Sequence, residues 1–237
     1  MVLQQNPVEI VRVQSKEQAA VHVLNVLKEE QASGRLHTVG LATGSTMYPI
    51  YESWLRSDLS FEEVTAFNLD EYIGLEKDHP QSYAYFMQDQ LFHAKPFKET
   101  YIPNGAAEDI ETECARYEQL LREHPTDIQF LGVGENGHIA FNEPGTPFDS
   151  VTHVADLTPS TIEVNSRFFD DIEEVPTTAM TMGIASILRA RKIILLAFGE
   201  RKRFAIEKLL EGTITTDYPI TALLQHNDVT IITDINM

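Results

Sequence analysis

A histidine, an amide and a carboxylate lie close together in a glycine-rich stretch that follows an apolar run. Asn136, His138 and Glu143 all fall between Gly132 and Gly145. Imidazole titrates near neutrality and needs a partner that fixes its tautomer, so His138 is a candidate general acid/base and Glu143 the carboxylate that orients it. A loop histidine capped by a nearby side chain explains the same residues equally well. One His with one Glu is a poor zinc signal, so we expect no metal.

The glycines of this stretch must first be tested as a dinucleotide-binding turn. Gly132, Gly134 and Gly137 spell G-x-G-x-x-G after the predicted strand Ile128-Val133. In the dinucleotide fingerprint the third glycine lies in a helix that continues and buries an apolar face. Here the chain reaches Pro144 too soon for such a helix. We therefore interpret the stretch as a glycine turn that presents polar groups to a ligand at the end of a strand.

A second glycine turn has the pattern of an anion site. The predicted strand His37-Leu41 runs into Ala42-Thr-Gly-Ser-Thr-Met47, and a helix is expected to follow. Free backbone N–H groups and the helix dipole would then point to the same place. Walker-type loops have Lys after the second glycine, whereas Ser45 follows Gly44 here. A single sugar phosphate fits this turn better than ATP or GTP, and a capped turn without a ligand is the alternative.

Three more charged residues lie where they could take part in chemistry. Asp70 follows an apolar run and is either a base for a carbon-bound proton or a cap. Because Asp70 and Glu71 point to opposite sides of an extended chain, at most one of them enters a common pocket. Arg167 lies in a weakly patterned segment, 150–180, that we expect to be a lid or binding loop. Lys202 falls in the first turn of a predicted helix, where a cation opposes the dipole unless an anion is near.

Length and charge limit the class of protein. The 237 residues predict one α/β domain spanning 1–237, and the net charge of -18 argues against nucleic acid or anionic membrane partners. The single cysteine, Cys114, excludes an internal disulfide and a multi-cysteine metal site. Residues 1–7 lack a signal-peptide pattern, and no apolar run approaches the roughly 20 residues of a membrane helix. We therefore expect a soluble cytoplasmic protein.

Strand and helix patterns alternate along the whole chain. The first predicted strand is Val8-Val13 and the last is Val229-Thr233, with an amphipathic helix expected after the capping residue Ser15. Such alternation predicts a single Rossmann-like fold, in which helices cover both faces of an open, mainly parallel sheet and a lid segment is added.

Taken together, these residues resemble a known family. The chain is similar to the glucosamine-6-phosphate deaminases in five segments that occur in the same order over most of its length. The third of them is the most specific. The five segments are Gly40-Leu-Ala-Thr-Gly-Ser-Thr46, Phe67-Asn-Leu-Asp-Glu-Tyr72, Leu131-Gly-Val-Gly-Glu-Asn-Gly-His-Ile-Ala-Phe-Asn-Glu-Pro-Gly145, Asn165-Ser-Arg-Phe-Phe169 and Gly199-Glu-Arg-Lys202.

The resemblance implies an activity and catalytic roles. The expected reaction converts glucosamine 6-phosphate and water to fructose 6-phosphate and ammonia without a cofactor. In this resemblance Asp70 removes the C2 proton and returns it to C1. His138 is the acid/base of ring opening, supported by Glu143 and Asn136. Many members have Asp where this chain has Asn136, which can donate a hydrogen bond but supplies no charge.

The resemblance also implies a substrate-binding set and a simple assembly. We expect six residues to contact the substrate, mainly its phosphate: Thr43, Gly44, Ser45, Gly137, Arg167 and Lys202. Allosterically activated hexameric members use basic residues after the central motif, where residues 150–156 offer only His153. We therefore expect a monomer or small homo-oligomer that acts on a small sugar phosphate without amino-sugar-phosphate activation.

Other functions remain open at this point. A sugar-phosphate lactonase or an isomerase of a related hexosamine phosphate would share the broad fold, but lactone hydrolysis does not need Asp70 to move a carbon-bound proton. A sugar-phosphate sensor would keep the anion turn and lose the chemistry. Such regulators usually carry a DNA-binding module, and this acidic chain has no spare basic segment for one. The C4 configuration of the substrate is not fixed by these residues.

Overall fold

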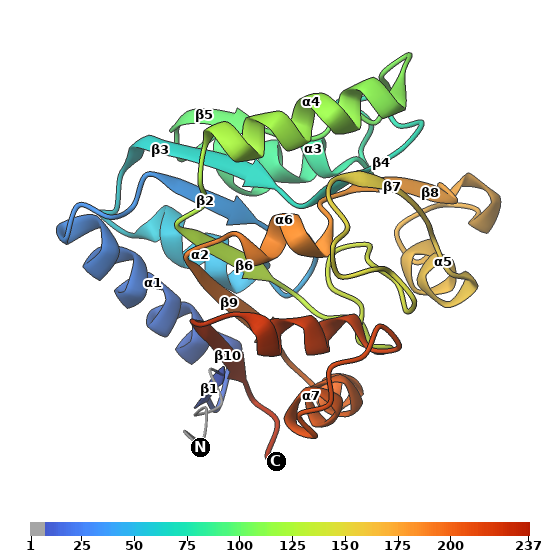
Figure 1. Cartoon of the computed structure of the whole chain (residues 1–237). Coiled ribbons are helices and arrows are strands. Elements are labelled where there is room, and N and C mark those ends of the chain that lie inside the picture. Colours follow the sequence, from blue (N-terminus) through green and yellow to red (C-terminus); the bar gives the residue numbers. More distant parts are fainter. Residues whose placement is uncertain (1–7) are drawn as a thin grey trace.

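The central element is a seven-stranded sheet in which every neighbouring pair is parallel. A computed structural model describes residues 8–237, so the expectation for residues 1–7 lies outside the described part. The strand order is β1-β10-β9-β6-β2-β3-β5 (Figure 1). The predicted mainly parallel α/β fold is confirmed. Its strands are β1 (Val8–Arg12), β2 (Thr38–Leu41), β3 (Phe61–Asn68), β5 (Phe97–Tyr101), β6 (Ile128–Leu131), β9 (Lys192–Ala197) and β10 (Val229–Thr233).

Helices cover both faces of this sheet, as predicted. In the strand register Phe67 and Gln129 both pair with Gly40 and share one face, so Phe130 points to the other. Trp54 of α2 packs on Phe130, with ring centroids 5.5 Å apart. On the opposite face, α4 packs on Phe67. The helices are α1 (Lys16–Ala32), α2 (Tyr48–Arg56), α3 (Tyr83–Met87), α4 (Ile110–Glu123), α5 (Pro159–Ser166), α6 (Ile184–Leu188) and α7 (Arg203–Leu210), with short turns η1 (Gln88–Phe92), η2 (Ile172–Glu174), η3 (Glu200–Lys202) and η4 (Pro219–Gln225).

A second, smaller sheet lies beside the first, and the segment within which a lid was predicted contributes β7 and the start of β8 to it. It is antiparallel, in the order β4-β8-β7, with strands β4 (Asp70–Tyr72), β7 (His153–Asp156) and β8 (Thr178–Thr181). Segment 150–180 is therefore not irregular, because it holds β7, α5 and η2. Its weak pattern has a physical cause: α5 buries only Thr161, and β7 buries only Ala155. None of the helices in residues 8–237 is long and apolar enough to cross a membrane.

The strand order brings most of the candidate residues to one edge. β9, β6, β2 and β3 are consecutive in the sheet, so the segments that leave their carboxyl ends emerge together. These segments carry Lys202, the glycine-rich stretch 132–145, the turn 43–45 and Asp70, respectively. The chain leaves β2 toward β3 and later returns to place β6 on the other side of β2. Open α/β sheets bind ligands at such a reversal of strand order.

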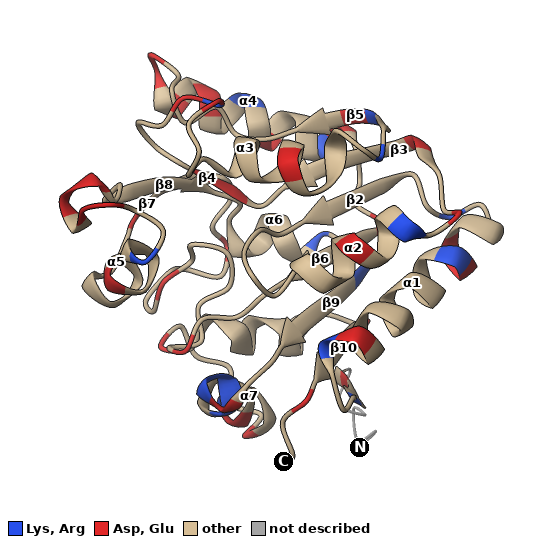
Figure 2. Ribbon diagram, turned by 180° about the vertical axis from the view of Figure 1, so that it is seen from behind, with Lys and Arg blue, Asp and Glu red and all other residues tan. Residues whose placement is uncertain are grey.

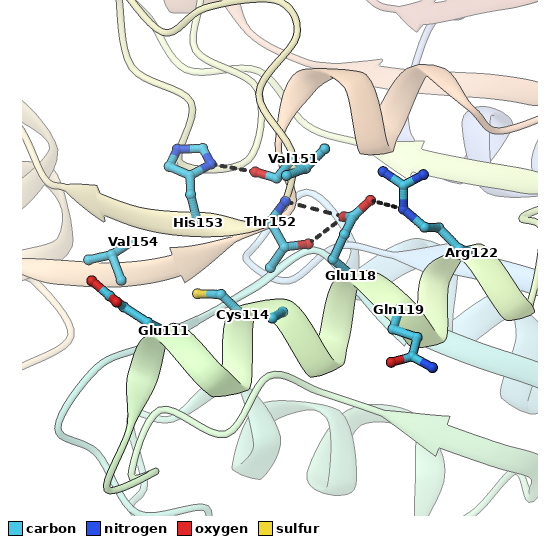
Figure 3. A pocket seen from close by; sticks show the side chains of 10 residues that line it. Glu111, Cys114, Glu118, Gln119, Arg122, Val151, Thr152, His153 and Val154 are labelled. Atoms are coloured by element: carbon cyan, nitrogen blue, oxygen red, sulfur yellow. Dashed lines mark hydrogen bonds and ion pairs between the residues drawn. The ribbon is translucent and has the colours of Figure 1, made fainter.

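A buried carboxylate ties the second sheet to the helix layer. Glu118 of α4 accepts hydrogen bonds from the Thr152 N–H and hydroxyl, at 3.2 and 2.9 Å (Figure 3). It also accepts from Ser186 Oγ at 2.7 Å and from Arg189 Nη2 at 2.6 Å, and it pairs with Arg122 at 3.2 Å. Although burial acts to raise the pKa of Glu118, these donors lower it. One ionised side chain thus connects α4, α6 and the start of β7.

Replacing this carboxylate tests how much it stabilises the fold. Glu118→Ala leaves the partners of Glu118 without their acceptor, so we expect a loss of about 2–4 kcal/mol in the free energy of unfolding. Gln119→Ala, at an exposed position of the same helix, is the matched control and should change it by under about 0.5 kcal/mol. Urea denaturation measures both variants, and equal midpoints would contradict the connecting role of Glu118.

Candidate active site

The glycines after β6 make room for an imidazole ring. The Gly134 N–H donates to the His138 carbonyl at 2.8 Å, and Gly137 turns the chain with a φ of 87°. A Cβ on Gly134 would lie 2.2 Å from Cε1 of His138, a distance at which atoms overlap. No helix forms between Gly132 and Pro144. The stretch therefore lacks the continuing helix of a dinucleotide-binding turn.

Asn136, His138 and Glu143 form one hydrogen-bonded relay. His138 Nδ1 lies 2.7 Å from Asn136 Oδ1 and 3.3 Å from Glu143 Oε2. The Asn136 amide N–H donates to the same Glu143 oxygen at 2.9 Å, which fixes the orientation of the amide. Both groups that face Nδ1 are acceptors, so Nδ1 carries the hydrogen. In the neutral ring Nε2 then holds the free lone pair.

The second oxygen of Glu143 is bound by hydroxyls from α5. Thr161 Oγ1 donates to Oε1 at 2.5 Å, and Thr158 Oγ1 lies 3.4 Å from the same atom. Burial acts to raise the pKa of Glu143, but His138, Thr161 and Asn136 together lower it to about 2. Glu143 is thus the charged member of the relay. Sequence reasoning missed both threonines, although Thr158 followed by Pro159 is a helix-start signal that could have placed them near one another.

Asp70 and Glu71 are neighbours in β4, and their side chains point to opposite sides, as the alternation of an extended chain requires. The Glu71 carboxylate accepts three backbone N–H groups at 2.9 Å, from Tyr72, Tyr83 and Ala84 at the start of α3. Asp70 is 7% exposed, and within residues 8–237 no hydrogen bond or ion pair joins its side chain to the relay. Burial, with a smaller contribution from the Glu71 charge, raises the pKa of Asp70 to about 8. A carboxyl group in this state is poised to gain and lose a proton near neutral pH.

Arg167 lies close enough to Lys202 for its charge to act on the lysine amine. Lys202 is half-buried at the end of η3, and burial lowers its pKa, with further lowering by the charge of Arg167 and an opposing effect of Glu135. Arg167 ends α5 and stacks over Phe168 at 4.6 Å. Among the described residues neither cation has an ion-pair partner, whereas Arg201 next to Lys202 pairs with Glu135 at 3.6 Å. An anion would offset their mutual repulsion.

The strand, turn and helix predicted around residues 43–45 are present. Gly44 has a φ of 93°, and its carbonyl accepts the Met47 N–H at 3.0 Å, after which α2 begins. No side chain in the described part of the chain caps the start of α2, so its first N–H groups stay available to a ligand. Within residues 8–237 no hydrogen bond or ion pair joins this turn to Arg167 or Lys202.

Away from the carboxyl ends of the parallel strands, the described residues offer no metal-binding cluster, and the groove beside α4 holds none of the candidate residues. No group of three His, Cys, Asp or Glu side chains that could hold a metal occurs in the described residues. The groove in Figure 3 is lined by α4 and the start of β7, including Cys114 and His153, and contains none of the candidate residues. Burial raises the pKa of the Cys114 thiol to about 11, so it is unreactive at neutral pH.

Known proteins resemble the chain over nearly its whole length. The family described as glucosamine-6-phosphate isomerases and 6-phosphogluconolactonases matches residues 12–232. A glucosamine-6-phosphate deaminase of Streptococcus sanguinis strain SK36 is 54% identical over 226 residues, covering 95% of this chain and 96% of the relative. A glucosamine-6-phosphate deaminase of Enterococcus faecalis strain V583 is 50% identical, with coverage of 95% and 97%.

Solved structures share the fold at two levels of similarity. A monomeric glucosamine-6-phosphate deaminase superposes with a TM-score of 0.89 and 44% identity, covering 95% of this chain and 96% of that one. A 6-phosphogluconolactonase of Thermotoga maritima superposes with a TM-score of 0.76 and 18% identity, with coverage of 95% and 98%. The second similarity concerns the fold alone.

A substitution at Gly134 tests the tautomer of His138, because the imidazole ring fills the space beside this glycine. Gly134→Ala should displace the ring, so we expect the Nδ1–H tautomer of His138 to be lost from the imidazole nitrogen NMR spectrum at pH 8. Gly132→Ala is the control, because a Cβ there meets no atom within 4 Å. An unchanged His138 signal in Gly134→Ala would contradict the geometry of the relay.

The buried Asp70 carboxyl should make stability fall with rising pH. Its pKa of about 8 in the folded chain exceeds the unfolded value of about 3.9, so the folded state holds the extra proton between these values. Stability from this group is therefore complete below pH 4 and is lost as pH rises toward 8. Asp70→Asn should raise the melting temperature at pH 8 by roughly 2–4 °C or more, and the gain should shrink toward pH 5. Calorimetry at both pH values measures this, and a constant difference would contradict it.

Proposed function

The chain belongs to the family of glucosamine-6-phosphate isomerases and 6-phosphogluconolactonases, and we propose on this basis that it is a glucosamine-6-phosphate deaminase. It converts glucosamine 6-phosphate and water to fructose 6-phosphate and ammonia, a step of amino-sugar catabolism. The observation that carries this choice is the 50–54% identity with named deaminases over 95% of the chain. The 6-phosphogluconolactonase structures share only 17–18% identity with the chain.

His138 opens the sugar ring in this proposal. With the hydrogen on Nδ1 held by Asn136 and Glu143, the lone pair of Nε2 accepts the proton of the anomeric hydroxyl. The ring oxygen then receives a proton from the same nitrogen as the C1–O5 bond breaks. The charge of Glu143 stabilises the imidazolium that exists between these two transfers.

Asp70 then moves a proton between two carbons. Its ionised carboxylate removes the proton from C2 of the open-chain amino aldehyde, and the protonated carboxyl returns it to C1. A proton of the amino group moves to O1 in the same isomerisation, so the product is the 2-imine of fructose 6-phosphate, which water hydrolyses to the ketone and ammonia. Because burial raises the pKa of Asp70 to about 8, the same group can be a base and then an acid at moderate pH.

The phosphate group would bind at the same edge of the sheet. Arg167 and Lys202 provide the positive charge, and the turn Thr43-Gly44-Ser45 provides backbone N–H groups at the start of α2. Gly137 is expected to bring its backbone close to the sugar. Support comes from the two cations that lack an ion-pair partner within residues 8–237.

Assembly and location follow the same proposal. We expect a monomer or small homo-oligomer, because the similar solved structure is of a monomeric deaminase. The protein should work in the cytoplasm without a cofactor, a metal, nucleic acid or a membrane. The proposed lid lies within residues 150–180, and the proposed single domain spans residues 1–237.

The reaction itself is the direct test. The purified protein, incubated with glucosamine 6-phosphate, a chelator and no cofactor, should release ammonia and fructose 6-phosphate in equal amounts. Asp70→Asn should lower kcat by about 100-fold to 10,000-fold and still bind the substrate, because only proton transfer is removed. The kcat/KM of the unmodified protein should rise as pH increases toward 8.

The same variant separates the deaminase from a lactonase. Hydrolysis of 6-phosphogluconolactone that survives in Asp70→Asn, with no ammonia from glucosamine 6-phosphate, would overturn the proposed function. Tight binding of glucosamine 6-phosphate without any turnover would instead favour a sensor or an isomerase of a related sugar.

A further inference from the structure

Helix α5 carries a relay contact at one end and a cation at the other. Its first turn contains Thr161, whose hydroxyl donates to Glu143 Oε1 at 2.5 Å. Its last turn is followed by Arg167, which lies close enough to Lys202 to lower the pKa of that amine. Six residues at a rise of 1.5 Å separate these ends by about 9 Å. This span is comparable to the length of a hexose 6-phosphate.

The two oxygens of Glu143 depend on different segments of the chain. Oε2 is bound by Asn136 and His138 from its own loop. Oε1 is bound by Thr161 and, at 3.4 Å, by Thr158, and both hydroxyls belong to the start of α5. Among the described residues, His138 is the one titratable group that contacts this carboxylate. The loop alone therefore leaves half of a buried carboxylate without a donor.

Few side chains of α5 itself are buried. Of its residues only Thr161 is buried, and Ile162 is the side chain that packs on the small core of the second sheet. Val164 on the helix is 44% exposed and Phe168 beyond it is 42% exposed, whereas Phe169 packs on the same small core as Ile162. Elements with few buried apolar contacts open at low free-energy cost. The Thr161 hydrogen bond is thus one of the few buried contacts that the helix itself makes.

We propose that Thr161 is a positioning residue, which holds Glu143 against His138 from α5 and so makes the ring-opening relay complete only while α5 lies over the site. This inference rests on the proposed deaminase function. When Arg167 binds the phosphate, the same helix is held at its other end. Occupation of the phosphate site therefore favours the arrangement in which His138 is oriented for ring opening.

Removing the hydroxyl while keeping the side-chain shape tests the positioning role. Thr161→Val should lower kcat for glucosamine 6-phosphate by about tenfold and change KM by less than about threefold, because the buried Oε1 of Glu143 loses its nearest donor. Thr161→Ser restores the hydroxyl and should recover most of kcat. Ser166→Ala is the matched control on the same helix, since its hydroxyl bonds to the Glu163 carbonyl and not to the relay.

A double variant tests the link between the helix ends. Arg167→Ala should raise KM more than it lowers kcat, and combining it with Thr161→Val should cost less in kcat/KM than the product of the two single losses. A kcat/KM loss in the double variant equal to the product of the two single losses would overturn the link between the helix ends. An unchanged kcat in Thr161→Val would overturn the positioning role. An unmodified protein that releases no ammonia would instead refute the proposed function. Circular dichroism of each variant shows that the chain is folded.

Discussion

A buried carboxylate needs a donor for each oxygen, and Glu143 meets this requirement by drawing on two separate parts of the chain. Its own loop supplies Asn136 and His138, and α5 supplies Thr161. Since Asn136 is neutral, Glu143 brings the only negative charge that touches the imidazole among the described residues. The loop geometry, the His138 tautomer and the place of α5 all depend on this one ionised group.

The parts that the sequence predicted are those governed by local pattern. Continuous apolar runs such as residues 193–197 mark strands buried on both faces, and their alternation with helices predicts a parallel sheet. The contact of His138 with Glu143 was predictable because both lie in one short glycine-rich loop. The separation of Asp70 from Glu71 was predictable because successive side chains of an extended chain point to opposite sides.

The parts that the sequence did not reveal depend on contacts between distant residues. Thr161 reaches Glu143 across 18 positions, and Glu118 reaches Thr152 across 34, so neither contact leaves a local pattern. The second sheet was missed for a related reason. Its strands have only three or four residues and pack on a core of few side chains, so burial produces almost no periodicity in segment 150–180.

The distribution of charge has a consequence for how a substrate arrives. The net charge is -18, and acidic residues are spread over helices and loops around the molecule (Figure 2). An anionic sugar phosphate therefore meets overall repulsion during diffusion, and feels the attraction of Arg167 and Lys202 only within about 8 Å at physiological salt. Long-range electrostatic attraction therefore does not speed the arrival of the substrate at Arg167 and Lys202. The rate of productive encounter is set by screening in the surrounding electrolyte and by the short final approach.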